Sequence, residues 1–285
     1  MPGLNLRQRF ADARASQHRP SRAAYVLPTA FTAGNIFLGF VSVMQSIQAV
    51  GLARDGTGGA EHHFEIAALT IGIACLLDGL DGRIARLMGA TSRFGAELDS
   101  LCDFVCFGTV PALLLYLWEM QRLDRAGWTI VLIYAICTAL RLARFNTALD
   151  VQQPPWAHYF FTGVPAPAGA GLVLLPLIAS FVLPEGRIES YPLAVAAWIV
   201  FVGALMISRI PTFAMKRVRV PNHMVLPTLL LGVIIAAGLA TETWITFIVI
   251  AAVYLLSIPF SIRLMLRLRR AAAGAADPAV ETHQP

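Results

Sequence analysis

The stretch FEIAALTIGIACLLDGLDGRIARLM, residues 64–88, decides the fold class of this protein. It is long and apolar enough to cross a bilayer, because a transmembrane helix needs about 17–25 mainly apolar residues. Its two aspartates, Asp78 and Asp81, lie toward its C-terminal end. An ionised aspartate at mid-bilayer costs about 2.5–3.5 kcal/mol, so such residues usually have a function. The stretch predicts a membrane helix that carries functional acids.

Similar apolar runs occur along the rest of the chain. Of 285 residues, 57% are hydrophobic and only 14% are charged, whereas soluble domains average about 25% charged residues. This composition argues against a soluble enzyme, a disordered or collagen-like chain, a secreted disulfide scaffold and a nucleic-acid binder. We predict an all-α, polytopic membrane bundle of about eight transmembrane helices. The predicted spans are residues 28–50, 64–88, 95–118, 127–148, 160–183, 192–209, 224–241 and 243–262.

Two prolines, Pro165 and Pro167, lie near the start of the fifth predicted span. Proline removes a backbone donor and clashes with the preceding turn of a helix. We therefore expect these residues to bend or break the span, or the helix to begin later than residue 160.

Lys and Arg residues are distributed very unevenly between the two sides of this layout. Of the 22 basic residues, 18 fall on one side, and the other side holds only Arg54, Arg122, Arg125 and Arg187. Cytoplasmic flanks of membrane proteins carry the excess of Lys and Arg. The split predicts that both termini are cytoplasmic, and it explains the net charge of +5 by membrane orientation.

The membrane domain is predicted to cover residues 28–270, between two tails. Residues 1–27 form a basic cytoplasmic segment that either lies on anionic headgroups or is solvated. Its Arg-rich, acid-poor composition also leaves a transit peptide open. Residues 271–285 are rich in Ala, Gly and Pro and are predicted to be a disordered tail.

The four cysteines of the chain all lie in apolar runs, where a thiol usually acts as a small packing residue. We therefore predict no disulfide. These residues are Cys75, Cys102, Cys106 and Cys137.

Four aspartates lie within or at the ends of the second and third spans. At about 100° per residue, Asp78 and Asp81 share one helix face, and Asp99 and Asp103 share another. The short connection between the spans makes them antiparallel neighbours and brings both acidic faces together near the cytoplasmic end. Clustered oxygen ligands select Mg²⁺, Mn²⁺ or Ca²⁺. Spacing alone leaves two alternatives open, a fixed ion-pair network with nearby arginines and a cation or proton pathway.

Three small residues accompany these acids on the same helix faces: Gly82, Ala85 and Gly95. They either leave room for a bulky ligand to approach the backbone or form an ordinary contact between membrane helices.

The acidic stretch reads D-G-L-D-G-R-I-A-R from Asp78 to Arg86, then eight residues, then G-A-E-L-D-S-L-C-D from Gly95 to Asp103. This resembles the signature of the CDP-alcohol phosphotransferases, D-x-x-D-G-x-x-A-R followed by G-x-x-x-D-x-x-x-D, at every fixed position. The resemblance implies transfer of a substituted phosphoryl group from a CDP-linked donor to an alcohol, with release of CMP.

Other stretches resemble the serine-using branch of this family, the membrane-embedded phosphatidylserine synthases. The donor is then expected to be CDP-diacylglycerol and the acceptor L-serine, with glycerol 3-phosphate or inositol phosphate as alternatives that would need a denser basic pocket. The resemblance also implies a homodimer in the inner (cytoplasmic) membrane, with its active site facing the cytoplasm. The stretches are PTAFTAGNIFLGF at 28–40, RLARFN at 141–146, FTGVPAPAGA at 161–170 and IPTFAMK at 210–216.

The family signature implies roles for the acidic residues. Asp78, Asp81 and Asp99 would hold two divalent ions, Mg²⁺ or Mn²⁺. Asp103 would complete this set and act as the general base that accepts the proton of the serine hydroxyl.

Candidate binding residues surround the acids. For CDP-diacylglycerol, the resemblance and the depth of the first span suggest Gly82, Ala85, Arg86, Gly95, Thr32 and Asn35. For serine, an Arg fork suits a carboxylate, although Arg residues at a cytoplasmic helix end are also expected from topology alone. The serine candidates are Arg141, Arg144, Asn146 and Lys216.

Two rival classes remain, a cation or proton transporter and a membrane scaffold whose acids only pair with arginines. A transporter often places its carboxylates near mid-membrane in two related halves, whereas these acids crowd one end without a repeat. A scaffold gives no reason for an intact eight-residue signature. The sequence therefore favours the transferase.

Overall fold

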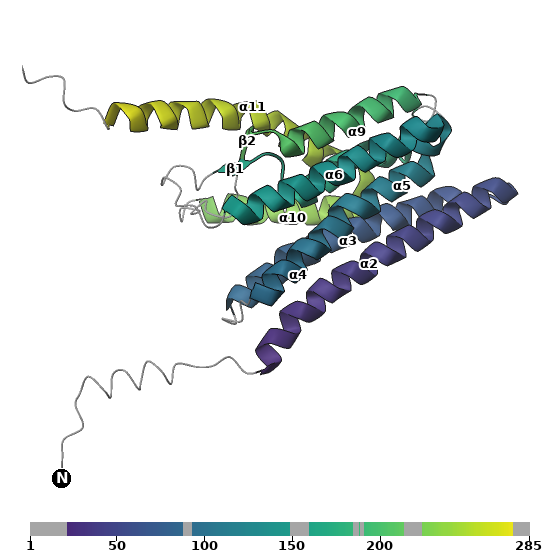
Figure 1. Cartoon of the computed structure of the whole chain (residues 1–285), viewed down its shortest axis with the longest axis horizontal. Coiled ribbons are helices and arrows are strands. Elements are labelled where there is room, and N and C mark those ends of the chain that lie inside the picture. The colour runs from purple at the N-terminus through teal and green to yellow at the C-terminus, as the bar shows by residue number, and fades with distance from the viewer. Residues whose placement is uncertain are drawn as a thin grey trace, which may run out of the picture.

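The computed structural model describes residues 22–87, 93–148, 160–184, 188, 191–213 and 224–275, and they form a bundle of long helices (Figure 1). Five helices are long and apolar enough to cross a membrane, and three shorter apolar helices accompany them. The prediction of a helical membrane protein is therefore confirmed, and the count of eight spans stays a prediction. The five long helices are Thr29–Asp55, Ala60–Ile84, Phe94–Trp118, Met120–Thr147 and Thr243–Leu268.

The first two helices, α2 (Arg22–Asp55) and α3 (Ala60–Leu87), form an antiparallel pair. Ser42 of α2 donates a hydrogen bond from Oγ to the main-chain oxygen of Ala67 of α3, at 2.9 Å. Small residues at the contact let membrane helices approach closely. The connecting turn needs backbone conformations that glycine adopts without strain, and its positive φ angles belong to Gly56, Gly58 and Gly59.

The third span consists of three consecutive helical segments, α4 (Arg93–Asp103), the π-helical turn η1 (Phe104–Thr109) and α5 (Val110–Trp118). The change in hydrogen bonding at η1 has a cause in the sequence, because Pro111 has no N–H to donate to the carbonyl group four residues earlier. That carbonyl group belongs to Phe107. The segment places Asp103 directly before the π-helical turn.

The fourth span follows the short 3₁₀ turn η2 (Met120–Leu123) and is formed by α6 (Asp124–Ala148). It packs against α9 (Pro192–Ile207) and η1. Because α6 runs antiparallel to α5, its C-terminal end returns to the end of the bundle that holds Asp103.

The region after α6 contains two short strands that the sequence analysis did not predict. β1 (Phe160–Thr162) pairs antiparallel with β2 (Pro211–Phe213), with Phe161 opposite Thr212. The predicted span at 160–183 is corrected here, since its first residues form β1 and the helical part begins later, in α7 (Ala166–Val173) and α8 (Leu175–Ser180).

Pro165 and Pro167 both lie at the start of α7. Pro165 is the N-cap residue and Pro167 lies in the first turn. Proline is tolerated there because the first N–H groups of a helix have no partner within it. The expectation that the helix begins later is confirmed, and the prolines set its start.

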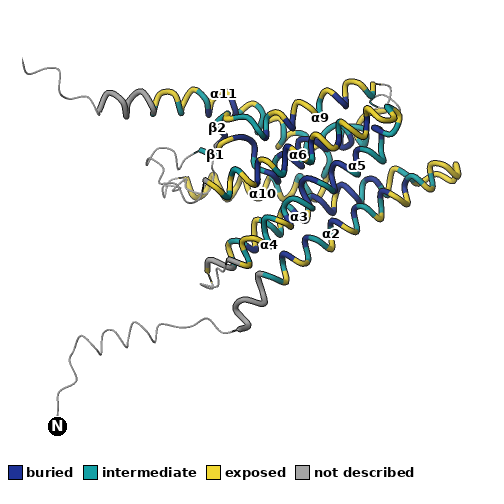
Figure 2. Tube along the Cα trace, viewed as in Figure 1, coloured by how far each residue is buried: buried dark blue, intermediate teal, exposed yellow. Residues whose placement is uncertain are grey.

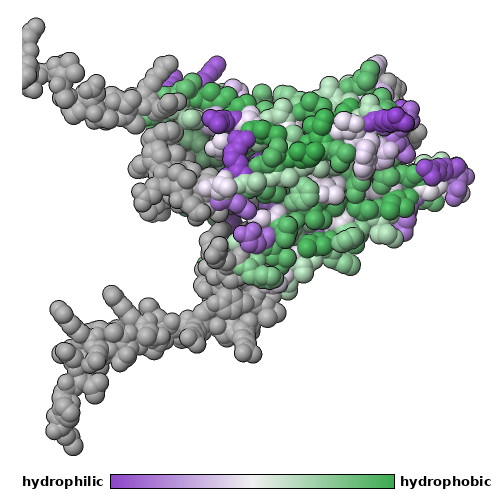
Figure 3. Space-filling model, in the orientation of Figure 1, coloured by the Kyte–Doolittle hydropathy of each residue, from purple (hydrophilic) through white to green (hydrophobic). Residues whose placement is uncertain are grey.

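The last two helices are α10 (Val225–Thr241) and α11 (Thr243–Ala275). No residue of α10 is buried, and much of α11 is exposed, whereas most of α5 is buried (Figure 2). Hydrophobic residues cover most of the surface between the helix ends, and hydrophilic residues gather toward those ends (Figure 3). This distribution fits a protein whose sides contact lipid.

Candidate active site

The two acidic helix faces meet in the structure. One carboxylate oxygen from each of Asp78, Asp99 and Asp103 lies within 4.8 Å of the others, and all three residues are half-buried. We call these three residues the aspartate cluster. Asp78 comes from α3, and the other two come from α4. Their positions agree with the face assignment that helical spacing predicted.

The fourth aspartate, Asp81, lies beside this cluster. It is only 3% exposed, and its Oδ2 accepts a hydrogen bond from Thr32 Oγ1 of α2 at 3.4 Å. The sequence analysis placed Thr32 near the site by its depth in the first span. The structure therefore brings α2, α3 and α4 together at the acids.

The aspartate cluster fits a divalent ion by the chemistry of its donors. Carboxylates held this close repel one another unless a cation or shared protons compensate their charge. Half-buried oxygen ligands suit hard cations such as Mg²⁺ and Mn²⁺. The cluster can therefore hold a metal ion. Asp81 is not part of this group of three but lies within electrostatic range of Asp99 and Asp78.

The α2 side of the site is fixed by two thiol groups. Cys102 Sγ donates to the Thr32 main-chain oxygen at 3.3 Å, and Cys106 Sγ donates to the Asn35 main-chain oxygen at 3.2 Å. Asn35 is 2% exposed, and its Oδ1 accepts no hydrogen bond within the described part of the chain. A buried polar atom without a partner is unusual, so Asn35 is well placed to meet a ligand.

A buried cation lies on the α6 side of the aspartate cluster. Arg141 is 9% exposed and lies within electrostatic range of Asp103 and Asp78. Its guanidinium carbon lies 5.9 Å from the centre of the Phe145 ring. Among the described residues, its Nε has no hydrogen-bond partner. The group is thus positioned to bind an anion close to the acids.

The other two serine-binding candidates on α6, Arg144 and Asn146, make hydrogen bonds to neighbouring helices. Arg144 donates hydrogen bonds to the main-chain oxygens of Ile207 and Ser208, at the C-terminal end of α9. Asn146 donates from Nδ2 to Ser100 Oγ at 3.0 Å. These bonds attach α6 to α9 and to α4, next to the aspartate cluster.

The remaining predicted site residues divide into two groups. Gly82 and Gly95 are half-buried on the same helices as the acids. The side chains of Ala85 and Arg86, and all of Lys216, lie outside the described residues.

One feature of the site was missed by the sequence analysis. The buried Tyr134 of α6 donates a hydrogen bond from its hydroxyl to the main-chain oxygen of Phe107 in η1, at 2.8 Å. π-helical turns occur often at functional sites. Pro111 within an apolar run was the available signal for this irregular turn.

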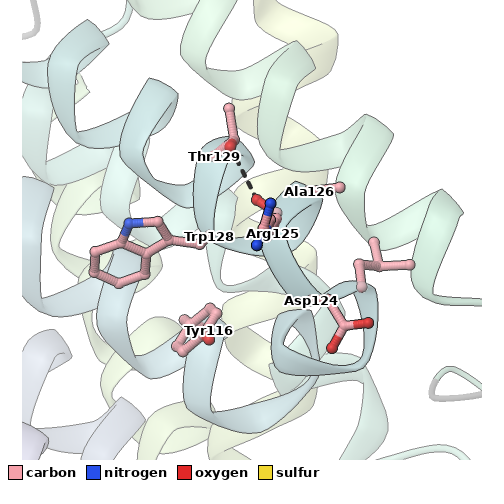
Figure 4. Close-up of a pocket in the computed structure, with 7 residues that line it drawn as sticks. Tyr116, Asp124, Arg125, Ala126, Trp128 and Thr129 are labelled. Atoms are coloured by element: carbon pink, nitrogen blue, oxygen red, sulfur yellow. Dashed lines mark hydrogen bonds between the residues drawn. The ribbon is translucent and has the colours of Figure 1, made fainter.

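A second hollow lies far from the aspartate cluster, where α5 turns into α6 (Figure 4). Its volume is about 850 Å³, and Tyr116 and Trp128 stack edge to face beside it with ring centres 5.2 Å apart. Tyr116 lies thirteen positions after Asp103 along the helical segments, which is a length of about 20 Å. This hollow is therefore distinct from the site.

Comparison with known proteins gives consistent matches over most of the chain. Residues 25–205 match the family model described as CDP-alcohol phosphatidyltransferase, and residues 223–259 match one described as CDP-alcohol phosphatidyltransferase 2. Three relatives named CDP-diacylglycerol–serine O-phosphatidyltransferase are similar to the chain. The Mycobacterium leprae protein is 38% identical over 87% of this chain and 78% of its own length.

The other two relatives give the same picture. The Mycobacterium tuberculosis protein is 37% identical over 84% of this chain and 78% of its own length. The Helicobacter pylori protein is 35% identical over 70% of this chain and 77% of its own length. Together with the signature from Asp78 to Asp103, these matches show that the chain belongs to the CDP-alcohol phosphatidyltransferase family.

Proposed function

We propose that this protein transfers the phosphatidyl group of CDP-diacylglycerol to the hydroxyl group of L-serine, giving phosphatidylserine and CMP. The observation that carries the proposal is the aspartate cluster, formed by residues of the family signature. The names of the relatives from three bacteria support serine as the acceptor. Transfer to glycerol 3-phosphate or inositol phosphate is the alternative that the experiment below tests.

The acids are proposed to hold two divalent ions, Mg²⁺ or Mn²⁺. Asp78, Asp81 and Asp99 are the ligands that the family signature implies, and Asp103 completes the set. When bound, the ions neutralise the pyrophosphate and stabilise negative charge on the leaving CMP. The clustering of three carboxylates within 4.8 Å supports this role.

Asp103 is also the proposed general base. In the reaction, the serine hydroxyl oxygen attacks the phosphatidyl phosphorus, and the bond between that phosphorus and the CMP oxygen breaks. The hydroxyl proton passes to the Asp103 carboxylate. Asp103 belongs to the aspartate cluster and lies within electrostatic range of Arg141. This position supports the role because a base must reach the acceptor that Arg141 would bind.

The donor is proposed to enter from the α2 and α3 sides. Thr32 donates to Asp81, and Asn35, one turn further along α2, has a buried Oδ1 with no partner among the described residues. Both side chains therefore suit contacts to the cytidine. Gly82, Ala85 and Gly95 would leave room for the nucleotide, and Arg86 would contact a phosphate group.

Arg141 is the strongest of the proposed serine-binding residues. It is buried, lies near Asp103, and its Nε has no partner among the described residues. A guanidinium group binds a carboxylate through paired hydrogen bonds. Arg144, Asn146 and Lys216 are proposed as supporting residues of the acceptor pocket, with Arg144 also holding the end of α9.

The proposed arrangement in the cell follows the charge distribution. Residues 28–270 would form the membrane domain, with eight spans, both termini in the cytoplasm and the site facing the cytoplasm of the inner membrane. The basic tail at 1–27 and the tail at 271–285 would lie outside the bilayer. A homodimer is proposed from the family resemblance.

The test is a reconstitution of purified protein in vesicles that contain CDP-diacylglycerol, with labelled L-serine and Mn²⁺. The proposal expects labelled phosphatidylserine and an equal amount of CMP, and no product when the metal is chelated. Asp99→Asn should abolish both products, whereas the exposed Asp55→Asn at the other end of α2 should not. CMP release only with a phosphorylated acceptor would contradict the serine assignment.

A further inference from the structure

The last helix of the described chain lies against the site. At the end of the bundle away from the aspartates, Trp244 of α11 donates from Nε1 to Glu65 Oε1 of α3, at 3.0 Å. Further along, α11 contacts β2. Ile258 and Ser261 of α11 are buried, and they share one helix face with Tyr254 because they lie four and seven residues after it. This face therefore packs into the bundle.

Tyr254 brings a hydroxyl group close to Arg141. The two side chains lie within electrostatic range of each other. The Tyr254 hydroxyl is buried and faces Thr212 of β2, whose own hydroxyl donates to the main-chain oxygen of Gly163 at 2.9 Å. Within the described ranges, neither the Tyr254 hydroxyl nor the Arg141 Nε makes a hydrogen bond of full geometry. Two buried polar groups with unused hydrogen-bonding capacity thus lie within electrostatic range of each other.

Burying both groups destabilises the protein unless a ligand or a water molecule supplies the missing hydrogen bonds. A buried polar group without a partner is destabilising, and a buried cation without one is more so. Both groups can donate hydrogen bonds, so the ligand that satisfies them is an anion with acceptor oxygens. A carboxylate offers two such oxygens. A phosphate group would call for further cations, and Arg144, the next arginine of α6, already donates to the main-chain oxygens of Ile207 and Ser208.

We propose that Tyr254 determines acceptor specificity by donating a hydrogen bond to the carboxylate group that Arg141 binds. The inference rests on the proposed function, because L-serine is the acceptor that carries this carboxylate. It also gives a role to α11, whose residues up to 259 belong to the second family match at 223–259. The C-terminal helices thereby help to build the acceptor pocket rather than only enlarging the bundle.

The test compares L-serine with serinol, which keeps the amino and hydroxyl groups but has no carboxylate. The CMP-release kcat/KM for each acceptor is measured in the wild-type protein and in Tyr254→Phe, which removes only the hydroxyl. The exposed Tyr191→Phe is the matched control. A ratio of two acceptors does not depend on how much protein is folded, so it separates recognition from stability.

The wild-type protein is expected to prefer serine over serinol, and Tyr254→Phe should reduce this preference about 10- to 150-fold, as loss of a hydrogen bond to a charged group does. The KM for CDP-diacylglycerol should not change, and Tyr191→Phe should behave as wild type. If the serine-to-serinol ratio of kcat/KM in Tyr254→Phe stays within about twofold of the wild-type ratio, the role of Tyr254 is wrong. That result would leave the proposed function unchanged. CMP release by the wild type with glycerol 3-phosphate but not with serine would overturn the proposed function itself.

Discussion

The hydroxyl of Tyr134 on α6 donates a 2.8 Å hydrogen bond to the main-chain oxygen of Phe107, in the π-helical turn that follows Asp103. Pro111 lacks the N–H group that would otherwise reach this oxygen. The tyrosine therefore satisfies a buried carbonyl group that the proline leaves open. It also attaches the helix of Arg141 to the helix of Asp103, so that the two groups keep a fixed relation.

Tyr134→Phe should destabilise the protein while leaving its fold intact. The substitution leaves the buried Phe107 carbonyl group without its donor, and such a loss costs about 1–3 kcal/mol. The measurement is the free energy of unfolding in detergent micelles, with the exposed Tyr191→Phe as control. Equal unfolding free energies for the two variants would show that the Tyr134 hydroxyl does not support the π-helical turn.

Metal binding should stabilise the wild-type protein but not Asp99→Asn. A ligand that binds only the folded state at 100 times its dissociation constant adds about 2.7 kcal/mol. We therefore expect Mn²⁺ to raise the melting temperature of the wild type and EDTA to reverse the rise. Asp55→Asn, a change at an exposed aspartate outside the cluster, should respond as wild type. An equal Mn²⁺ response in Asp99→Asn would argue against metal at the aspartate cluster.

Gly163→Ala should be strongly destabilising. Gly163 has φ of +79°, and a Cβ atom there would lie 2.5 Å from the main-chain oxygen of Met206. A strained backbone of this kind costs about 1–3 kcal/mol, and the clash adds to it. Gly171→Ala, where a Cβ would meet nothing within 4 Å, is the matched control. Thermal unfolding of both variants tests this, and similar melting temperatures would contradict the geometry at Gly163.

Two arginines of α6 should respond differently to substitution. Arg144 holds main-chain oxygens at the end of α9, so Arg144→Ala should lower the melting temperature. Arg141→Lys keeps the charge but loses the planar fork, so it should raise the KM for serine about tenfold or more, as expected for losing about 1.4 kcal/mol of binding. The melting temperature and the KM for serine are measured for both variants. A large loss of melting temperature in Arg141→Lys together with a raised KM only in Arg144→Ala would contradict the two assignments.

The helices and the aspartate cluster could be predicted from the sequence because they depend on regular spacing. Apolar runs long enough to cross a bilayer indicated the helices, and 100° per residue placed Asp99 and Asp103 on one face. The fifth span was placed too early, since three-residue strands such as β1 have too few residues for a recognisable alternation. Pro165 and Pro167 indicated the later start correctly.

Contacts between distant segments could not be predicted in this way. Arg141 and Arg144 were equivalent in the sequence, because both are arginines at one end of a span. Only packing distinguishes them, since Arg144 meets the end of α9 while Arg141 is buried toward the acids. The position of Tyr254 beside Arg141 likewise depends on how α11 folds back onto the bundle.

The central claim is that Asp103 activates the serine hydroxyl for attack on CDP-diacylglycerol. The most direct measurement is CMP release by purified protein with Mn²⁺ and CDP-diacylglycerol, offering L-serine, glycerol 3-phosphate or inositol phosphate separately to the wild type and to Asp103→Asn. The account predicts release that depends on serine and disappears in Asp103→Asn. Release from the wild type with another acceptor alone, or serine-dependent release that persists in Asp103→Asn, would contradict it.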